Sequence, residues 1–351
     1  MEPAKTLVVN VVTWNSARFL PHLFESIAAQ TTNAFTVTVV DNASSDGTLA
    51  WLREKARGVP VLKNFRNGGF ARAHNQAIAF ALQRWEAEGA LDRKYILVLN
   101  PDILLAPTCI AQLLSFMDTH PDVDMAGPKL LRADRRTNED GEIVDIERSS
   151  LIDSAGISLL KSRRVIDRGA GEKDSGQYDG GEPFGISGAA MLLRASVIPS
   201  IVLQNGEVFD EDFFAYKEDA DLSWRFRLLG KRIAFVPGAV AWHHRTARAS
   251  RGGLIEQYAI RRNRASVIMK YSRRNQLWLE WKNDDAGSRL LHFPWIAAEK
   301  IRRVCAATLF PSSAVPALFE AWAGFGRMRR KRKELLTRRR LSPGQIRALF
   351  S

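Results

Sequence analysis

The stretch Tyr95–Asp102 constrains the fold more than any other part of the chain. Its first five residues, Tyr95–Leu99, are all apolar, which is typical of a strand buried on both faces of a parallel sheet. Pro101 has no backbone N–H and restricts the residue before it, so the strand must end there. Asp102 is therefore predicted at the carboxyl end of a strand, where open α/β sheets bind their ligands. The alternative, from this segment alone, is that Asp102 only caps a helix predicted over Pro107–His120.

The same order of strand, polar loop and helix repeats from the first residues onward. The strands predicted before Tyr95 are Leu7–Val12, Thr36–Val40 and Val59–Leu62, and a helical pattern follows each of them. This rhythm with short connections predicts an α/β fold with a doubly wound, mostly parallel sheet flanked by helices. The loops after the strands then meet at one edge of the sheet. They carry Thr13, Asn15, Asp41, Asn67 and Asp102.

Two glycines, Gly68 and Gly69, stand at the predicted start of a helix, directly after Asn67. Glycines at such a place let backbone N–H groups approach a phosphate. Their spacing matches neither the dinucleotide-binding fingerprint nor a Walker P-loop. On their own they are a weak sign of a nucleotide site.

The middle of the chain returns to strands after a loop-rich part. Met125–Pro128 is predicted to be a strand, and residues 134–179 are charged and contain glycines, which predicts loops with one hairpin. A further strand is predicted over residues 184–193. Small residues at positions 187–189 open that strand and leave room for a ligand.

Three carboxylates, Glu218, Asp219 and Asp221, lie at the start of a predicted helix. Like charges this close are unfavourable unless a cation, a helix N-terminus or a catalytic task holds them together. Arg225 follows Asp221 by one helical turn, so the two are expected to pair. The alternative interpretation is a helix start that is simply exposed to solvent.

Two histidines follow the last predicted strands. These strands are Ile233–Val236 and Ala239–Trp242, separated by Pro237-Gly238, and they bring His243 and His244 to a strand end. A histidine pair after a strand is more often structural than metal-binding when nothing else is known. The residues alone therefore leave both interpretations open.

Length and cysteine content point to a globular intracellular protein. A chain of 351 residues accommodates one large α/β domain with an appendage, or two domains. Cys109 and Cys305 lie far apart in unlike surroundings, which indicates free thiols and a cytoplasmic location. We expect neither a signal peptide nor a membrane span, because no apolar run reaches about 18 residues.

The net charge of +13 is concentrated near the C-terminus. In residues 324–351, ten Lys or Arg side chains face Glu334 as the single acidic residue. A polybasic tail is therefore predicted, with nucleic acid or an anionic membrane surface as its candidate partner. The predicted organisation is an α/β domain over residues 1–250, a helical region over residues 251–323 and this tail.

Taken in order, the motifs resemble the family 2 inverting glycosyltransferases of the GT-A fold, most closely the rhamnosyltransferase-like members. The resemblance covers about residues 6–250. The motifs that carry it are Asp41-Asn42-Ala43-Ser44-Ser45-Asp46-Gly47-Thr48, Asn67-Gly68-Gly69-Phe70-Ala71, Leu99-Asn100-Pro101-Asp102, Ser187-Gly188-Ala189, Glu218-Asp219 and Trp242-His243.

The resemblance implies a nucleotide-sugar site and a divalent cation, Mg²⁺ or Mn²⁺. Asp41 would accept the base N3–H of a uridine or thymidine nucleotide, and Asp102 would bind the cation that bridges the two phosphates. Many members carry a full Asp-x-Asp motif, whereas the first acidic position here is Asn100. His243, rather than His244, would compensate as a second metal ligand. The nucleotide pocket would also include Thr13, Asn15, Asn67, Gly68 and Gly69.

The resemblance also assigns the chemistry of transfer. Asp219 corresponds to the general base that takes a proton from the acceptor hydroxyl as it attacks the anomeric carbon. Attack from the face opposite the diphosphate inverts the configuration in one displacement. Glu218 and Asp221 would orient the helix and the substrate. The pocket for sugar and acceptor would consist of Ser187, Gly188, Ala189 and Glu218.

The favoured function is transfer of a sugar, with rhamnose as the candidate, to a saccharide or lipid-linked saccharide in cell-envelope polysaccharide synthesis. The enzyme would sit peripherally at the inner face of the cell membrane, held by its tryptophans and basic tail. A nucleotidyltransferase of similar α/β fold is the alternative enzyme. A nucleic-acid-binding protein that uses the tail is a further alternative, but it leaves the acidic loops unexplained.

Overall fold

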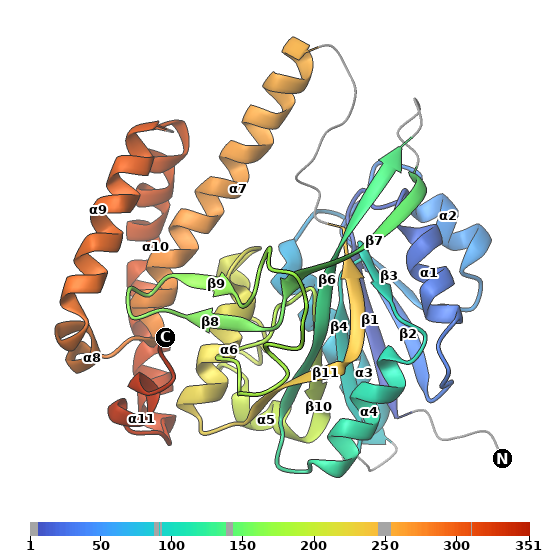
Figure 1. Ribbon diagram of the computed structural model, residues 1–351, viewed down its shortest axis with the longest axis horizontal. Helices are drawn as coiled ribbons and strands as arrows, with labels where there is room; N and C mark the ends of the chain where they lie inside the picture. Colours follow the sequence, from blue (N-terminus) through green and yellow to red (C-terminus); the bar gives the residue numbers. More distant parts are fainter. Residues whose placement is uncertain (1–5, 88–90, 92, 138–142, 245–253, 310) are drawn as a thin grey trace.

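The computed structural model describes residues 6–87, 91, 93–137, 143–244, 254–309 and 311–351. In them, helices cover a central nine-stranded sheet, and a layer of further helices lies beside it (Figure 1). The strands of this sheet are β1 (Leu7–Thr13), β2 (Phe35–Asp41), β3 (Val61–Lys63), β4 (Tyr95–Leu99), β5 (Ile103–Leu105), β6 (Met125–Thr137), β7 (Ile143–Ser154), β10 (Ala190–Arg194) and β11 (Ile233–His243).

The order of the sheet is β3-β2-β1-β4-β10-β6-β11-β5, and β7 pairs with β6. Strands β3, β2, β1 and β4 run parallel, whereas β10 is antiparallel to both of its neighbours, β4 and β6. The predicted mostly parallel sheet is confirmed, with β5, β7 and β10 as its antiparallel members. The parallel direction brings the carboxyl ends of β1, β2 and β4 to one edge.

Helices cover both faces of this sheet. The sequence of β4 shows why both faces must be covered. Leu97 and Leu99 contribute to the core on one face, while Ile96 and Val98 contribute to the core on the other, and none of the four is exposed. The run of apolar residues is thus buried on both sides, as predicted. The helices around the sheet are α1 (Leu20–Ala28), α2 (Thr48–Lys55), α3 (Gly69–Ala87), α4 (Cys109–Thr119), α5 (Ile198–Ile201) and α6 (Glu218–Leu228).

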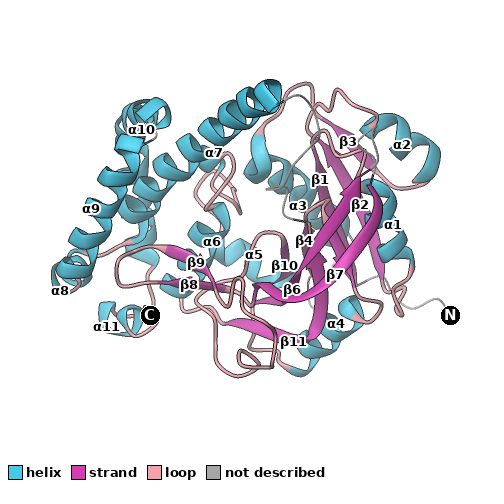
Figure 2. Cartoon of the chain, turned by 45° about the horizontal axis from the view of Figure 1, so that its top comes forward, coloured by secondary structure: helices cyan, strands magenta, loops and turns pink. Residues whose placement is uncertain are grey.

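The C-terminal part forms a helical layer that packs against the sheet domain through α6 (Figure 2). The predicted boundary between residues 323 and 324 falls inside a continuous helix, and basic side chains from that part of the helix are already paired. Lys331 lies 2.5 Å from a carboxylate oxygen of Asp210 and 2.8 Å from one of Asp212. No helix of the described residues is long and apolar enough to cross a membrane. The helices of this layer are α7 (Leu254–Asn283), α8 (Ala286–Leu291), α9 (Phe293–Leu309), α10 (Pro311–Arg338) and α11 (Pro343–Arg347).

Two regions contain more strand than the sequence predicts. The segment 134–179 includes the long hairpin of β6 and β7 and a small sheet of β8 (Ile157–Leu159) and β9 (Val165–Asp167). Pro237-Gly238 does not separate two strands. The register of β11 against β6 shifts between Val236 and Val240, so the dipeptide is accommodated as a bulge within one strand.

Candidate active site

The ends of β1 and β2 form one polar cluster around Asp41, which is fully buried. Its carboxylate accepts hydrogen bonds from the Thr13 hydroxyl at 2.9 Å and from the Ser44 hydroxyl at 2.6 Å. Asn15 adopts a positive φ of 51°, and its backbone N–H donates to the Ser44 hydroxyl at 2.9 Å. The loops after the two strands are therefore fixed to each other, and the sequence-predicted Thr13, Asn15 and Asp41 lie together.

The glycine loop before α3 joins the same edge through Asn42. The Asn42 side chain donates to the Gly69 carbonyl at 3.0 Å, and the Asn67 side chain accepts from the Gly69 N–H at 2.8 Å. Gly69 has a φ of +83°, and a Cβ there would lie 2.4 Å from the carbonyl oxygen of Phe214. This position therefore requires glycine, and the reason is contact with the segment before α6.

Asp102 lies between β4 and β5 and faces the His243 ring. The distance from Asp102 Oδ1 to His243 Nε2 is 3.5 Å, and the other ring nitrogen, Nδ1, lies 2.8 Å from an oxygen of buried Asp153. The backbone N–H of His244 donates to the Asp102 carbonyl at 2.9 Å, and the His244 ring lies 6.3 Å from that of Phe19. His243 is thus the histidine whose ring faces the Asp102 carboxylate.

The arrangement of Asp102, His243 and Asp153 fits a divalent cation. If a cation replaced the proton on Nε2, the proton on Nδ1 would be donated to Asp153, as in carboxylate–histidine–metal groups. Burial lowers the pKa of His243, but the carboxylates of Asp102 and Asp153 outweigh it and raise the pKa to about 10. A positive charge is therefore favoured between these groups. Among the described residues no cluster of three or more His, Cys, Asp or Glu ligands is present.

Asp219 opens α6 and points at the small residues before β10. The backbone N–H of Gly188 donates to Asp219 Oδ2 at 3.0 Å, and that of Ala220 donates to Oδ1 at 2.7 Å. Burial raises the pKa of Asp219, and these two hydrogen bonds oppose the rise. A carboxylate with a raised pKa is more basic than an ordinary aspartate, which suits a general base.

The neighbouring carboxylates of α6 are more deeply buried. Burial, together with the charge of Asp219, raises the pKa of Glu218 well above its usual range, and Glu218 Oε2 has no hydrogen-bond partner in the part of the chain that the structure describes. Asp221 is fully buried and accepts from Lys282 at 2.8 Å and from the Asn283 side chain at 2.8 Å. The expected pair of Asp221 with Arg225 is present at 3.3 Å.

The segment before α6 has a strained backbone. Phe214, Tyr216 and Lys217 all have φ between 64° and 71°, a region that residues other than glycine rarely adopt. Asn275 of α7 compensates for this conformation, because its amide group donates to the carbonyls of residues 213, 215 and 216 at 2.7 to 2.8 Å. A helix from the C-terminal layer thus fixes the turn that presents Asp219.

These pieces form one connected edge. The N–H of Asn100, beside Asp102, donates to the Ala189 carbonyl at 2.9 Å, and residues 187–189 contact Asp219. The backbone N–H of Ala71 in turn donates to the Phe214 carbonyl at 3.2 Å, which links the glycine loop to the Asp219 segment. The sequence-predicted site residues therefore lie along one continuous series of contacts.

Sequence reasoning missed several residues at this edge. Asp153 stands in the part predicted as loops, and Asn275 in a helix that no motif connects with the site. Arg132 pairs in register with His243, and its buried Nε has no hydrogen-bond partner among the described residues. Arg132 and Asp153 both lie at register shifts between β6 and β7, so no regular alternation marks them, and Asn275 gives no local signal.

Known proteins resemble this chain in sequence and in fold. The family model described as Glycosyl transferase family 2 matches residues 8–198. The N-acetylglucosaminyl-diphospho-decaprenol L-rhamnosyltransferase of Mycobacterium tuberculosis is 28% identical over 249 residues, which are 68% of this chain and 76% of the relative. The rhamnosyltransferase WbbL of Escherichia coli K12 is 25% identical over 234 residues, which are 67% of this chain and 81% of the relative.

Two solved structures share the fold at low sequence identity. S. aureus TarS 1-349 in complex with UDP-GlcNAc has a TM-score of 0.51 at 16% identity and covers 94% of this chain and 89% of its own. GalNAc-T7 with UDP, GalNAc and Mn²⁺ has a TM-score of 0.51 at 13% identity, and the match covers 87% of this chain and 58% of GalNAc-T7. Both are glycosyltransferase folds of the GT-A type. The family model spans more than half of the chain, so this protein belongs to glycosyl transferase family 2.

Proposed function

We propose that this glycosyltransferase moves a rhamnosyl group, with inversion, from a dTDP- or UDP-linked donor to a saccharide or lipid-linked saccharide acceptor. The observation that carries the proposal is the series of contacts that connects Asp41, Asp102 and Asp219 along one sheet edge. The rhamnosyltransferase names of the two relatives support the sugar. The decaprenol in one of these names supports a lipid-linked acceptor in cell-envelope polysaccharide synthesis.

The nucleotide would bind at the polar cluster around Asp41. Each carboxylate oxygen has two lone pairs, so Asp41 retains acceptor capacity for a pyrimidine N3–H beyond its bonds to Thr13 and Ser44. Asp41 has no exposed surface, so the base reaches it only when the side chains that cover Asp41 move. Asn67–Gly69 would then support the ribose and phosphates.

The diphosphate and the divalent cation would lie at Asp102 and His243. Carboxylate oxygen and imidazole nitrogen suit Mn²⁺, and Mg²⁺ would rely more on the oxygen ligands. When bound, the cation would neutralise the charge that develops on the departing nucleoside diphosphate. Asp153 orients the His243 ring, and Arg132 offers an unpaired guanidinium N–H beside it for a phosphate oxygen.

The acceptor hydroxyl would approach Asp219 over Ser187–Ala189. Asp219 takes the proton while the hydroxyl oxygen bonds to the anomeric carbon and the diphosphate leaves from the opposite face. Glu218 is the weaker candidate, because its deeper burial favours the protonated form, which cannot accept a proton. Glu218 and Asp221 would instead support the helix start.

A lipid-linked acceptor would require the enzyme to work at a membrane surface. We therefore propose that the enzyme sits peripherally at the inner face of the cell membrane. The basic residues of 324–351 are not a free tail, since many of them belong to α10 and several are paired with the sheet domain. Another surface is needed to explain membrane contact.

The test is a panel of nucleotide sugars incubated with lipid-linked and soluble acceptors, with Mg²⁺, Mn²⁺ or chelator. We expect transfer from a rhamnosyl donor, release of the nucleoside diphosphate, and a product of inverted anomeric configuration determined by NMR. Release of pyrophosphate would indicate nucleotidyl transfer instead. A product of retained configuration would exclude the single displacement at Asp219.

A further inference from the structure

Exposed apolar side chains are concentrated on helices α8, α9 and α10. Of the sixteen large apolar side chains that are exposed in the described part of the chain, eleven lie between Leu290 and Phe325. Such a concentration marks a surface that meets a partner. The eleven residues are Leu290, Leu291, Phe293, Trp295, Ile301, Val304, Val315, Leu318, Phe319, Trp322 and Phe325.

On α10 these side chains share one face. Val315, Phe319, Trp322 and Phe325 recur every three or four residues, which is the spacing of a single helix face, and we call them the α10 stripe. Phe319 is 77% exposed and Trp322 is 66% exposed. One helical turn after Phe325, the same face carries Arg329. The stripe therefore passes directly from apolar to basic.

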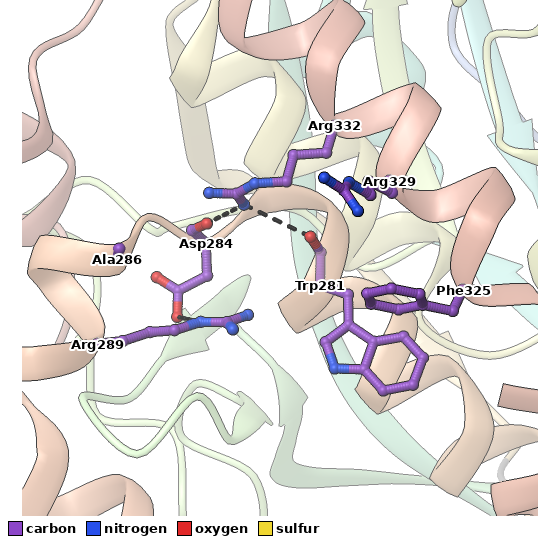
Figure 3. A pocket seen from close by; sticks show the side chains of 7 residues that line it. All are labelled: Trp281, Asp284, Ala286, Arg289, Phe325, Arg329 and Arg332. Atoms are coloured by element: carbon purple, nitrogen blue, oxygen red, sulfur yellow. Dashed lines mark hydrogen bonds and ion pairs between the residues drawn. The ribbon is translucent and has the colours of Figure 1, made fainter. Parts of the chain in front are cut away.

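A cavity of about 270 Å³ opens where the stripe ends (Figure 3). Its apolar wall is formed by the rings of Trp281 and Phe325, whose centroids lie 5.1 Å apart. Arginine side chains from α8 and α10 lie around the remainder of the opening. We call it the arginine pocket; it is lined by Trp281, Asp284, Ala286, Arg289, Phe325, Arg329 and Arg332.

The arginine pocket has more positive than negative charge. Asp284 is the only carboxylate among its lining residues, and it already binds Arg289 at 3.0 Å and Arg163 at 2.9 Å. Arg332 donates to backbone carbonyls at the C-terminal end of α7. Arg329 has no hydrogen-bond or ion-pair partner among the described residues and is exposed. A phosphate is the ligand that such a group of guanidinium donors binds best.

We propose that the α10 stripe and the arginine pocket dock this protein onto an anionic phospholipid membrane, with a lipid phosphate in the pocket. Apolar side chains next to arginines match the order of acyl chain and headgroup in a bilayer. Residues 286–335 contain ten Lys or Arg and three acidic residues, and of the ten, within the described residues, only Arg327 and Lys331 pair with Asp210 or Asp212. The remaining eight still outnumber the acidic residues, so a second copy placed face to face would meet like charge. The proposal rests on the membrane location proposed above and adds the surface that makes the contact.

The test is co-sedimentation of the full chain with vesicles of phosphatidylglycerol and phosphatidylcholine or of phosphatidylcholine alone. Phe319→Ser combined with Trp322→Ser should lower binding to the anionic vesicles at least tenfold. Arg329→Gln should lower it about fivefold, and only when phosphatidylglycerol is present. The matched controls, Leu151→Ser on β7 and Arg53→Gln on α2, should bind as the unchanged protein does.

A second readout identifies the surface in contact. Cys305 is exposed on α9 while Cys109 is buried, so an environment-sensitive fluorophore can be attached at Cys305. Its emission should shift to the blue with anionic vesicles, and the stripe variants should abolish the shift. Thermal melts and hydrolysis of the donor in solution verify folding and the active site, so that a failure of docking is distinguishable from a failure of the sugar-transfer proposal.

Three outcomes would overturn the docking proposal. The stripe variants could retain full vesicle binding, which would place the contact elsewhere. Light scattering could show a dimer that Phe319→Ser dissociates, with no vesicle binding, which would make the surface an interface between copies. The protein could bind glycerol 1-phosphate, with Arg329 required, and yet not bind vesicles. The pocket would then be a site for a free phosphate.

Discussion

The proposed nucleotide site around Asp41, which we call the nucleotide side, and the turn of the proposed base Asp219, which we call the base side, are held in place by different parts of the chain. Around Asp41, polar side chains from adjacent loops of the sheet bond one another, as Thr13 and Ser44 do. The turn before Asp219 is held by Asn275, which belongs to a helix that follows the sheet in the chain. The nucleotide side is thus a property of the sheet domain, whereas the base side depends on the C-terminal layer.

Because of this difference, substitutions on the two sides should affect different kinetic quantities. A change on the base side should lower turnover while donor affinity is preserved. A change on the nucleotide side should do the reverse. A variant that lowers both equally would show that the two sides are not independent.

The largest effect is expected from Asp219→Asn, which keeps the size of the side chain and removes its basicity. Transfer should fall roughly 10²–10⁴-fold, with donor affinity nearly unchanged. Steady-state kinetics and donor calorimetry measure the two quantities. Glu218→Gln is the matched control and should lose less turnover, or lose stability. An inactive Glu218→Gln beside an active Asp219→Asn would reverse the two roles.

Asp102→Asn should have the opposite signature. The variant removes the acidic ligand from its loop, so donor binding should no longer depend on the divalent cation, while the melting temperature is preserved. Titration calorimetry with and without chelator measures this. Metal-dependent donor affinity equal to that of the unchanged protein would remove Asp102 from the cation site.

Asp153→Asn tests the carboxylate that is hydrogen-bonded to the His243 ring. Because the amide cannot hold the imidazole as a carboxylate does, affinity for Mn²⁺ should fall about 10- to 100-fold. Electron paramagnetic resonance of free Mn²⁺ measures the change without any transfer reaction. His244→Asn is the control, since that ring lies on the side of Phe19, and it should leave Mn²⁺ affinity as it was. Equal losses in both variants would mean that the strand end is simply disturbed.

A pair of asparagine variants sharpens the contrast between the sides. Asn275→Ala removes the donor of the Ala215 and Tyr216 carbonyls, while the Phe213 carbonyl keeps its bond from Arg274. A buried unsatisfied group costs about 1–3 kcal/mol. We expect a lower melting temperature and a lower kcat at unchanged donor KM. Asn42→Ala, which frees the Gly69 carbonyl, should instead raise donor KM. If both variants changed the same kinetic constant, the proposed division would be wrong.

The smallest effect is expected in the pH dependence. Asp219 must be ionised to accept a proton, and burial raises its pKa. The acid limb of kcat should therefore lie above pH 4, the usual range of an aspartate, and activity should fall as the pH drops through it. A pH–rate profile in saturating donor measures the limb. A limb at or below pH 4 would contradict a buried base.

The sequence predicts the nucleotide side well because its signals are local. A strand that ends at a carboxylate or at Pro101, followed by a polar turn, places Asp41 and Asp102 at the sheet edge without any knowledge of distant contacts. Once the strands are known to be parallel, their loops must meet. The order of the motifs then supports the same family that the comparisons find.

The residues that support His243 and the turn before Asp219 are harder to predict for a physical reason. Asp153 lies 90 residues from His243 in the chain, and Asn275 lies 62 residues from the carbonyl of Phe213. Neither position has a local pattern that distinguishes a buried hydrogen-bonding residue from an ordinary one. The two strands predicted around Pro237-Gly238 are one strand, because pairing with β6 continues past the bulge.

The hydrogen bonds from Asn275 to the turn before Asp219 can form only after α7 has been synthesised on the ribosome. Domains generally fold as units, N-terminal part first, so the sheet domain can fold before α7 has been completed. At that stage the strained turn lacks the hydrogen bonds from Asn275, and Asp219 is not yet held in position. A nascent chain would therefore form the surroundings of Asp41 before it can position Asp219.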